Sequence, residues 1–271
     1  MTAPHPDPRQ IAEAAARAGG AVIREALDAR GGVQRYETKD GGGIDLLTAV
    51  DLAAEEAVRA VLQERSPGVP VLAEEGGGAA DAATRWIVDP IDGTTNFVHG
   101  FPSFGTSIGL QVDGELVAAC VYDPLRDEAY TAHRGGGATC NGRPLAVSST
   151  DALGRALLLT GFAYDRRERP DFYLAYVRRM LVAAQGLRRA GAAALDFCHI
   201  AAGRADGYWE FHLSPWDCAA GILLVEEAGG RVTTLARGPV DLNHPEILCT
   251  NGHIHDEMAR ALAPALSSAD V

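Results

Sequence analysis

The sequence predicts a mixed α and β fold in which sheets and helices pack as layers. Three observations support this prediction. Two stretches near the N-terminus carry apolar residues at the three- and four-residue spacing of amphipathic helices. Residues 69–122 hold short apolar runs separated by turn residues, which is typical of strands. From residue 155 onward, apolar runs of strand length alternate with helical patterns. We therefore expect a single domain over 1–271, with subdomains of roughly 1–150 and 151–271.

Two helices are predicted before residue 70. The first begins at Asp7-Pro8, an N-cap residue followed by a first-turn proline, and ends at Gly31-Gly32. The second begins at Thr48-Ala-Val-Asp51, which has the pattern of a capping box, and ends at Ser66-Pro67-Gly68. The chain between them is predicted to be a loop that contains the flexible glycines 41–43.

The remaining elements follow from apolar runs and the turn residues between them. Asp113-Gly114 predicts a two-residue hairpin turn, because both residue types accept positive φ angles. Gly135-Gly136-Gly137 and Asn141-Gly142 predict two further turns. In chain order we expect strands at 69–72, 86–89, 106–112, 115–122 and 157–160, helices at 171–184 and 192–202, a strand at 207–211, a helix at 217–228, strands at 230–235 and 247–250, and a helix at 255–262.

The composition limits the possible partners and the compartment. The 271 residues include 24 Lys and Arg against 36 Asp and Glu, a net charge of −12 at pH 7. This balance argues against nucleic acid or an anionic membrane as a partner, because both need a basic face. We find neither a secretory signal pattern nor an apolar run of about 18 residues. The five cysteines form no CxxC pair, which argues against a disulfide framework. We expect a soluble cytoplasmic protein.

The densest chemical signal is the segment Trp86–Phe97. An apolar strand delivers Asp89 at its carboxyl end, and Pro90 is expected to end the strand pairing and turn the chain. Asp92 can then point back to where Asp89 points, and the Ile91 carbonyl between them becomes available as a third oxygen. Mg²⁺ prefers such a set, with room left for water and phosphate. Without its surroundings the pair of acids would be explained as an ordinary turn.

Gly93 and the residues after it predict an anion site beside these acids. Glycine has no side chain, so a ligand can approach its amide closely. If Thr94-Thr95-Asn96 opens a helix, the free N–H groups and the positive end of the helix dipole favour a phosphate there. Metal ligands and a phosphate site so close together predict phosphoryl transfer to water.

A second metal ion needs acids from outside this segment. Glu74 follows the neighbouring short strand as Asp89 follows its own, and strand ends lie side by side in such sheets. Asp217 lies where a helix begins, and Asp51 is the N3 residue of the predicted capping box. Each also has an ordinary explanation as a loop acid or a helix cap, and the residues alone leave both explanations open.

Four stretches in the expected order resemble the inositol monophosphatase family. Trp86–His99 resembles its first signature and Trp216–Gly230 its second, while Leu72–Glu75 and Asp45–Asp51 match two further family stretches. The resemblance spans roughly residues 10–260. It implies a layered αβαβα sandwich and a Mg²⁺-dependent, lithium-sensitive phosphomonoesterase, commonly a homodimer.

The resemblance also implies a set of metal ligands. Glu74, Asp89 and the Ile91 carbonyl would hold a first Mg²⁺. Asp89, Asp92 and Asp217 would hold a second, and Glu74 would also serve a weaker third site. We therefore expect two to three Mg²⁺ ions per subunit.

Catalytic and phosphate-binding residues are implied in the same way. Thr94 and Glu74 would orient the attacking water, and Asp51 would support Thr94. The amides of Gly93 and Thr94 would bind the phosphate. Lys39 matches a lysine that the family places close to the metals.

At one position of the expected substrate site, this sequence differs from the usual family residue. Ala192 stands where the family often has Ser or Thr, so a hydroxyl contact is missing there. The residues that the resemblance implies in substrate binding, besides Gly93 and Thr94, are Gly191, Ala193, Glu210, Asp92 and Asp217.

Alternatives remain for the activity. The resemblance favours myo-inositol monophosphate, with histidinol phosphate and fructose 1,6-bisphosphate as alternatives; Thr94–Phe97 looks unlike the nucleotide branch. A second alternative is a non-catalytic regulatory relative, although a competent residue fills every metal position. His253-Ile-His255 is expected at the surface and is not assigned to zinc.

Overall fold

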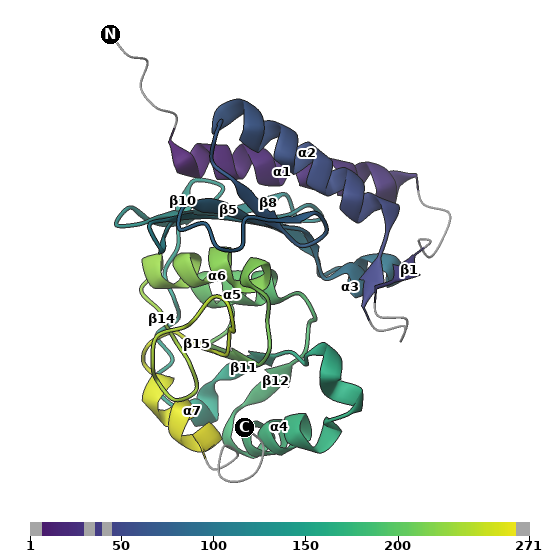
Figure 1. Ribbon diagram of the computed structural model, residues 1–271. Coiled ribbons are helices and arrows are strands. Elements are labelled where there is room, and N and C mark those ends of the chain that lie inside the picture. The colour runs from purple at the N-terminus through teal and green to yellow at the C-terminus, as the bar shows by residue number, and fades with distance from the viewer. Residues whose placement is uncertain (1–6, 30–35, 40–44, 264–271) are drawn as a thin grey trace.

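Three layers of helices alternate with two sheets (Figure 1). The computed structural model describes residues 7–29, 36–39 and 45–263. From one outer face to the other, the layers are α1 (Pro8–Asp28) and α2 (Ala49–Arg65), an eight-stranded sheet, α5 (Ala193–Ala201) and α6 (Pro215–Glu227), a five-stranded sheet, and α4 (Pro170–Ala183) and α7 (His255–Leu262). The predicted αβαβα sandwich is confirmed. No helix in the described ranges is long and apolar enough to cross a bilayer.

The eight-stranded sheet is built from residues before 150. Its neighbours pair antiparallel except for β3 and β5, which are parallel. In spatial order the strands are β10 (Arg143–Pro144), β9 (Gly137–Cys140), β8 (Glu128–His133), β7 (Glu115–Asp123), β6 (Gly105–Val112), β5 (Arg85–Asp92), β3 (Val71–Ala73) and β4 (Gly77–Gly78).

The five-stranded sheet is built from residues after 155. In it β11 is parallel to both of its neighbours, while the other pairs are antiparallel. In spatial order the strands are β12 (Gly186–Arg188), β11 (Leu157–Thr160), β13 (Gly207–Glu210), β15 (Ile247–Thr250) and β14 (Arg231–Thr233). The division near residue 150 therefore coincides with a change of sheet, and the single-domain assignment stays a prediction.

Smaller elements surround the edge of the sandwich. A two-stranded ribbon lies beside a short helix at the edge of the first sheet, and two 3₁₀ turns flank β11. They are β1 (Glu37–Thr38), β2 (Leu46–Leu47), α3 (Thr94–His99), and the 3₁₀ turns Leu153–Arg155 and Tyr164–Arg167.

Three large apolar cores and a smaller cluster that includes Phe97 and Phe104 hold the layers together. One fills the space between the two sheets around α5 and α6, one lies under α1 and α2, and one lies between the second sheet and α4 with α7. The middle layer is closely packed: a Cβ at Gly221 of α6 would lie 2.3 Å from the Phe197 ring of α5. Glycine at this position therefore allows α5 and α6 to approach each other closely.

The predicted helices and strands agree with the structure to within three residues at either end. The 69–72 strand is shifted to Val71–Ala73, and the strands that were not predicted are β1, β2, β4, β8, β9, β10 and β12. The turn prediction at Asp113-Gly114 is confirmed, with φ angles of 50° and 88°. The predicted loop glycines 41–43 and the Gly31-Gly32 helix end lie outside the described residues.

The prediction that Pro90 ends the strand is wrong. Strand β5 continues to Asp92, and the pairing with β6 is interrupted by a register shift between Asp89 and Asp92. Proline lacks the N–H for a ladder bond, and the bulge accommodates this without ending the strand. The bulge places both acids at one end of β5.

Candidate active site

A cavity of about 150 Å³ opens where strand ends of both sheets meet the N-termini of α3, α5 and α6. Parallel strands bring their carboxyl ends to the same edge, and ligands bind in the crevice beyond them. The β3–β5 pair contributes acids, and the β12–β11–β13 set contributes the opposite wall. The predicted residues that line the cavity are Glu74, Asp89, Ile91, Asp92, Gly93, Thr94, Gly191, Ala193, Glu210 and Asp217.

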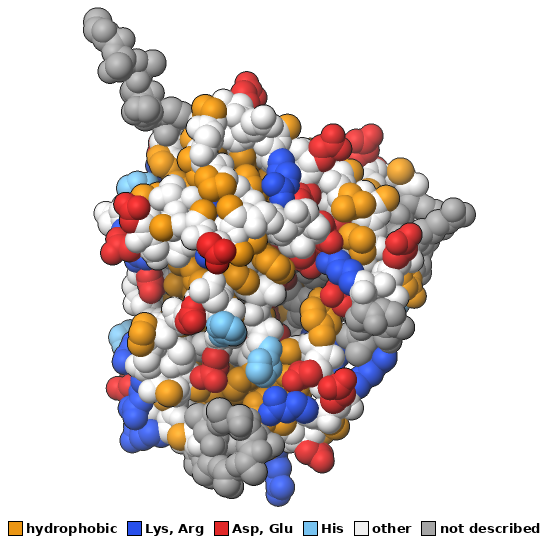
Figure 2. Space-filling view, in the orientation of Figure 1, with side chains coloured by type: hydrophobic (Ala, Val, Ile, Leu, Met, Phe, Trp, Pro, Cys, Tyr) orange, Lys and Arg blue, Asp and Glu red, His pale blue; other side chains and the backbone are white. Residues whose placement is uncertain are grey.

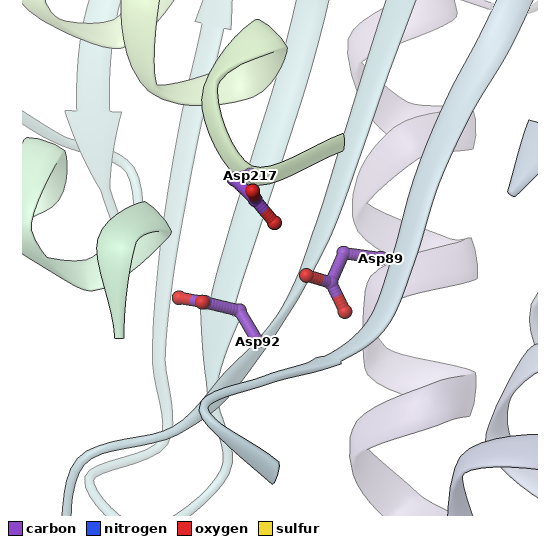
Figure 3. A group of neighbouring side chains, drawn as sticks. All are labelled: Asp89, Asp92 and Asp217. Atoms are coloured by element: carbon purple, nitrogen blue, oxygen red, sulfur yellow. The ribbon is translucent and has the colours of Figure 1, made fainter. Parts of the chain in front are cut away.

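Three carboxylates converge at the centre of this cavity (Figure 3). Asp89 and Asp92 come from the bulged end of β5, and Asp217 from the first turn of α6. One oxygen from each lies within 4.8 Å of the other two. Asp217 is the N3 member of a capping box and not the N-cap, which is Ser214. Its cap role and its place in the acid cluster therefore coexist.

The electrostatics of the acid cluster favour a bound cation. Burial raises the pKa of Asp89 well above its ordinary value, and the negative charge of Glu74 raises it further. Burial likewise raises the pKa of Asp92 to about 7. Asp89 Oδ1 is buried without a hydrogen-bond partner among the described residues. Because unpartnered buried carboxylates are costly, this donor set fits a hard divalent cation.

The Asp92 carboxylate is hydrogen-bonded by backbone amides from the second half of the chain. The backbone amides of Ala193 and Ala194, at the N-terminus of α5, donate to its two carboxylate oxygens at 3.1 and 2.8 Å. An acid at this end of a helix is also favoured by the helix dipole. The contact links the eight-stranded sheet to the middle helix layer directly at the acid cluster.

Glu74 borders the cluster and is paired to a lysine. Lys39 Nζ lies 2.8 Å from Glu74 Oε1 and 2.6 Å from Glu75 Oε1. The two carboxylates outweigh the burial of the ammonium group, so the pKa of Lys39 is raised. The side chain of Lys39 is 23% exposed, and it reaches the cavity only through Glu74.

Thr94 connects the cavity to helix α2. Its hydroxyl lies 3.1 Å from Asp51 Oδ1 and 3.0 Å from the Ile91 carbonyl oxygen, and can donate to either. Asp51 is fully buried and caps α2, accepting from the Thr48 amide at 2.8 Å. Asp51 therefore lies behind Thr94 and does not line the cavity.

The Gly93–Thr94 segment forms a tight turn into α3. Gly93 is the N-cap residue with φ 89°, and a Cβ there would lie 2.9 Å from the Ser103 carbonyl oxygen. The side-chain amide of Asn96 donates to that same carbonyl at 2.7 Å. The first amides of a helix have no partner within it, so this turn presents N–H groups to the cavity.

Glu210 stands on the opposite wall. The Tyr208 hydroxyl donates to its Oε2 at 2.5 Å. A Cβ at Gly161 would lie 1.9 Å from the same oxygen, so only glycine leaves room for this carboxylate. Burial raises the pKa of Glu210 to about 7. The remaining carboxylate lone pairs can accept hydroxyl hydrogen bonds from a ligand.

Several cavity residues were not predicted. Most come from the loop after β11 and from the chain ends of β12 and β13, where no motif marks them: Gly161, Phe162, Ala163, Tyr164, Arg166, Arg189, His212 and Leu213. Leu46 and Thr95 also line the cavity, and they lie in stretches that the sequence analysis singled out without giving these two residues a role. The proximity of the β11, β12 and β13 ends is a property of sheet order. A prediction of that order is the one signal that could have found them.

The surface prediction for His253-Ile-His255 is half wrong. His253 is exposed, but His255 is fully buried and lies 2.9 Å from both Thr233 Oγ1 and Thr250 Oγ1.

The charges on the molecular surface are mixed: Figure 2 shows acidic side chains interspersed with Lys and Arg on the face it draws. The acids of the cavity are a separate, recessed group.

Comparisons with known proteins identify the family of this chain. The sequence profile of the inositol monophosphatase family matches residues 7–268. An inositol-1-monophosphatase from Synechocystis is 44% identical over 262 residues, covering 94% of this chain and 88% of that protein. A Pseudomonas aeruginosa protein named Nus factor SuhB is 42% identical, covering 94% of this chain and 96% of that protein. The solved inositol monophosphatase of Anabaena has a TM-score of 0.85 at 43% identity and 95% coverage of both chains. The chain therefore belongs to the inositol monophosphatase family, metal-dependent phosphatases that hydrolyse phosphomonoesters.

Proposed function

We propose that this protein is a Mg²⁺-dependent phosphatase that hydrolyses myo-inositol monophosphate. One observation carries the proposal: Asp89, Asp92 and Asp217 converge within 4.8 Å beside the amides of Gly93 and Thr94. A cation site next to an anion-binding turn suits a phosphate ester. The names of relatives that are about 44% identical support inositol monophosphate as the substrate.

The metal ligands are proposed as follows. Glu74, Asp89 and the Ile91 carbonyl hold one Mg²⁺; Asp89, Asp92 and Asp217 hold a second; and Glu74 also serves a weaker third site. When bound, such ions lower the pKa of the attacking water and neutralise the leaving oxygen. The Thr94 hydroxyl has one proton, and when it donates that proton to Asp51 both lone-pair directions of the Ile91 carbonyl oxygen are available to a cation.

The chain's own residues position the nucleophile. If the Thr94 hydroxyl donates its proton to Asp51, its oxygen lone pairs face the cavity and can accept a hydrogen bond from a water. Glu74 accepts a hydrogen bond from the second O–H of the same water. The ammonium group of Lys39, 2.8 Å from Glu74 Oε1, holds the Glu74 side chain in place. The water is then oriented for in-line attack on phosphorus, with no covalent intermediate on the protein.

The substrate is held at both ends. The N–H groups of Gly93 and Thr94 bind phosphate oxygens. Glu210 accepts hydrogen bonds from ring hydroxyls on the opposite wall, and Gly191 and Ala193 allow the ring to approach the backbone at the start of α5.

The test is phosphate release from a panel: inositol 1-phosphate, histidinol phosphate, fructose 1,6-bisphosphate and adenosine 3′,5′-bisphosphate. Activity is measured with Mg²⁺, with EDTA, and with Mg²⁺ plus Li⁺. We expect Mg²⁺-dependent release from inositol 1-phosphate that Li⁺ inhibits. Activity in EDTA, or preference for histidinol phosphate, would contradict the proposal.

A second candidate is a non-catalytic regulatory role, which the relative named Nus factor SuhB suggests. Complete inactivity on the panel would favour this regulatory role.

We also propose that the protein is a homodimer in the cytoplasm. Light scattering that gives a monomer at micromolar concentration would contradict the dimer.

A further inference from the structure

We propose that a second cavity, at the other end of β5 and α6 from the acid cluster, binds a small carboxylate with an apolar body. The cavity has a volume of about 670 Å³, which is within the range of small-molecule sites in proteins. Among the described residues, none lines both this cavity and the candidate active site. The inference therefore goes beyond the proposed phosphatase function and does not depend on it.

The second cavity lies between the two sheets, beside the start of β5. Arg85 is the first residue of β5 and Asp89 is four residues further, so both belong to the same face of the strand. Gln111 of β6 lies opposite Arg85, and Leu116 of β7 lies opposite Gln111. This face packs on α6, which lies between the sheets in Figure 1 and whose Ile222 also lines the cavity. The elements that carry the acid cluster therefore extend to the second cavity as well.

Arg85 brings a buried positive charge to the lining of this cavity. The residue is only 4% exposed. Its Nε donates to Gln111 Oε1 at 3.0 Å, and its Nη1 donates to the carbonyl oxygens of Ala79 and Ala80. Among the described residues, no carboxylate oxygen lies within 4.0 Å of the guanidinium group, and Nη2 has no hydrogen-bond partner. Burial lowers the pKa of Arg85, and the charge of Asp81 offsets only part of this effect.

An anion in the cavity can bind the free side of this guanidinium group. The two N–H groups of Nη2 are available as donors, and a buried charge without a counter-charge is costly. A carboxylate accepts charge-assisted hydrogen bonds from such donors. A single unpaired cation balances one negative charge, so a carboxylate suits this site better than a doubly charged phosphate.

The other charges of the lining do not take the place of this anion. Arg134 Nη1 lies 2.7 Å from Glu226 Oε2, so these two residues neutralise each other. Glu115 and Asp241 are exposed, and water and salt screen their charges. Arg85 is therefore the cation of the lining that lacks an ionic partner within the described ranges.

Apolar side chains form the walls beside Arg85. They come from β7, α6, β14 and the chain between β14 and β15, and each is buried or partly buried against the core between the sheets: Leu116, Ile222, Val232, Val240 and Leu242. A ligand with an alkyl or aryl body would remove this surface from water while its carboxylate binds Arg85. The cavity therefore fits an amphipathic monoanion.

The test compares two probes of the same shape, 4-phenylbutyrate and its uncharged amide, 4-phenylbutanamide. Affinities are measured by NMR titration in EDTA, so that no metal ion in the acid cluster can hold the carboxylate. We expect the wild type to bind 4-phenylbutyrate about 10- to 100-fold more tightly than the amide. Equal affinities for the two probes, or no binding of either, would overturn the proposal.

Variants of the charged residues assign the preference to Arg85. Arg85→Gln should bind both probes equally, and an unchanged affinity for the amide shows that the cavity is intact. Arg134→Gln/Glu226→Gln is the matched control, because it removes a charged pair from the same lining without changing the net charge. It should keep the preference for 4-phenylbutyrate. A preference that survives in Arg85→Gln would contradict the proposal.

Two further variants locate the bound probe without changing Arg85. Leu242→Trp fills part of the cavity and should weaken the binding of both probes. Ala236→Trp, exposed on the same segment between β14 and β15 and outside the lining, should bind both probes as the wild type does. If Arg85→Gln does not fold, wild-type affinity for 4-phenylbutyrate in Leu242→Trp would overturn the site.

Discussion

Glu55 on helix α2 accepts a hydrogen bond from the backbone amide of Glu75, 3.0 Å from its Oε2. Its Oε1 accepts from Gly76 at 3.1 Å and from Arg59 Nε at 2.7 Å. This carboxylate is 5% exposed, and a Cβ at Gly76 would lie 2.4 Å from it. Glu55 therefore fixes the loop that carries Glu74, although it touches neither the cavity nor the acid cluster.

The first prediction concerns this contact. Glu55→Gln removes the charge that holds two backbone amides, so the Glu74 loop becomes less well positioned. We expect the Mg²⁺ concentration for half-maximal activity to rise about tenfold and the free energy of unfolding to fall by about 1–3 kcal/mol. A Mg²⁺ titration of activity and urea unfolding measure the two effects.

The exposed neighbour Glu56 provides the control, since Glu56→Gln leaves the hydrogen bonds from Glu55 to the amides of Glu75 and Gly76 intact. If Glu55→Gln lowered stability but left the Mg²⁺ dependence at the wild-type value, Glu55 would have a structural role only.

A second prediction concerns the centre of the acid cluster. Asp92→Asn replaces one carboxylate oxygen by an NH₂ group that faces a backbone amide of α5. We expect turnover to fall by about 10³-fold or more, with the fold intact by circular dichroism. Asp113→Asn, in the exposed hairpin turn, is the control. Phosphate release near the wild-type rate in Asp92→Asn would exclude the proposed metal role.

The sequence predicts those parts of the site whose residues are close together along the chain. Asp89, Asp92 and Gly93 belong to one strand and turn, so their proximity follows from short-range geometry. Asp217 was assigned to the cluster through the family resemblance, because its position at the start of a helix left a capping role equally open. The sequence pattern therefore contains most of the acid cluster and the layered fold.

The missed residues depend on long-range pairing. Arg166 and Arg189 are adjacent because β12 lies beside β11, and β12 is a three-residue strand with little periodic signal. In the sequence Glu55 cannot be told apart from an exposed acid on a helix. Its hydrogen bond with the Glu75 amide forms only when the loop that carries Glu75 folds against α2. His255 looked like surface sequence because its threonine partners lie on β14 and β15.

A third prediction tests the turn at Gly93. Gly93→Ala places a side chain at φ 89° and 2.9 Å from the Ser103 carbonyl oxygen. We expect about 1–3 kcal/mol of destabilisation and about a 100-fold loss of kcat, because the phosphate-facing amides move. Gly114→Ala has nearly the same φ, 88°, but open space around the new Cβ. It should lose stability without losing activity, and equal activity losses in both variants would contradict this account.

A fourth prediction concerns His255. Burial lowers its pKa to about 4 from an ordinary value of 6.5, so the unfolded chain binds the proton first as the pH falls. Stability is therefore lost between pH 6.5 and 4, by roughly 3 kcal/mol from this group. His255→Gln should show a smaller drop in unfolding free energy from pH 7 to 4.5, and exposed His253→Gln should behave as the wild type. Parallel pH profiles for His255→Gln and wild type would refute the assignment.

The last prediction concerns pH and metal together. Burial raises the pKa values of Asp92 and Glu210 to about 7, above those of the unfolded chain. Their stabilising contribution is therefore complete below about pH 4 and is lost as the pH rises through 7.

In EDTA we expect the melting temperature to fall between pH 5 and pH 8. Mg²⁺ binds the deprotonated carboxylates, so its stabilisation should grow over the same range. Scanning fluorimetry at each pH, with Mg²⁺ and with EDTA, measures the difference. Asp92→Asn should flatten the pH dependence in EDTA, because one of the carboxylates that must ionise is gone. A Mg²⁺ effect that is constant from pH 5 to 8 would show that these acids do not control the metal site.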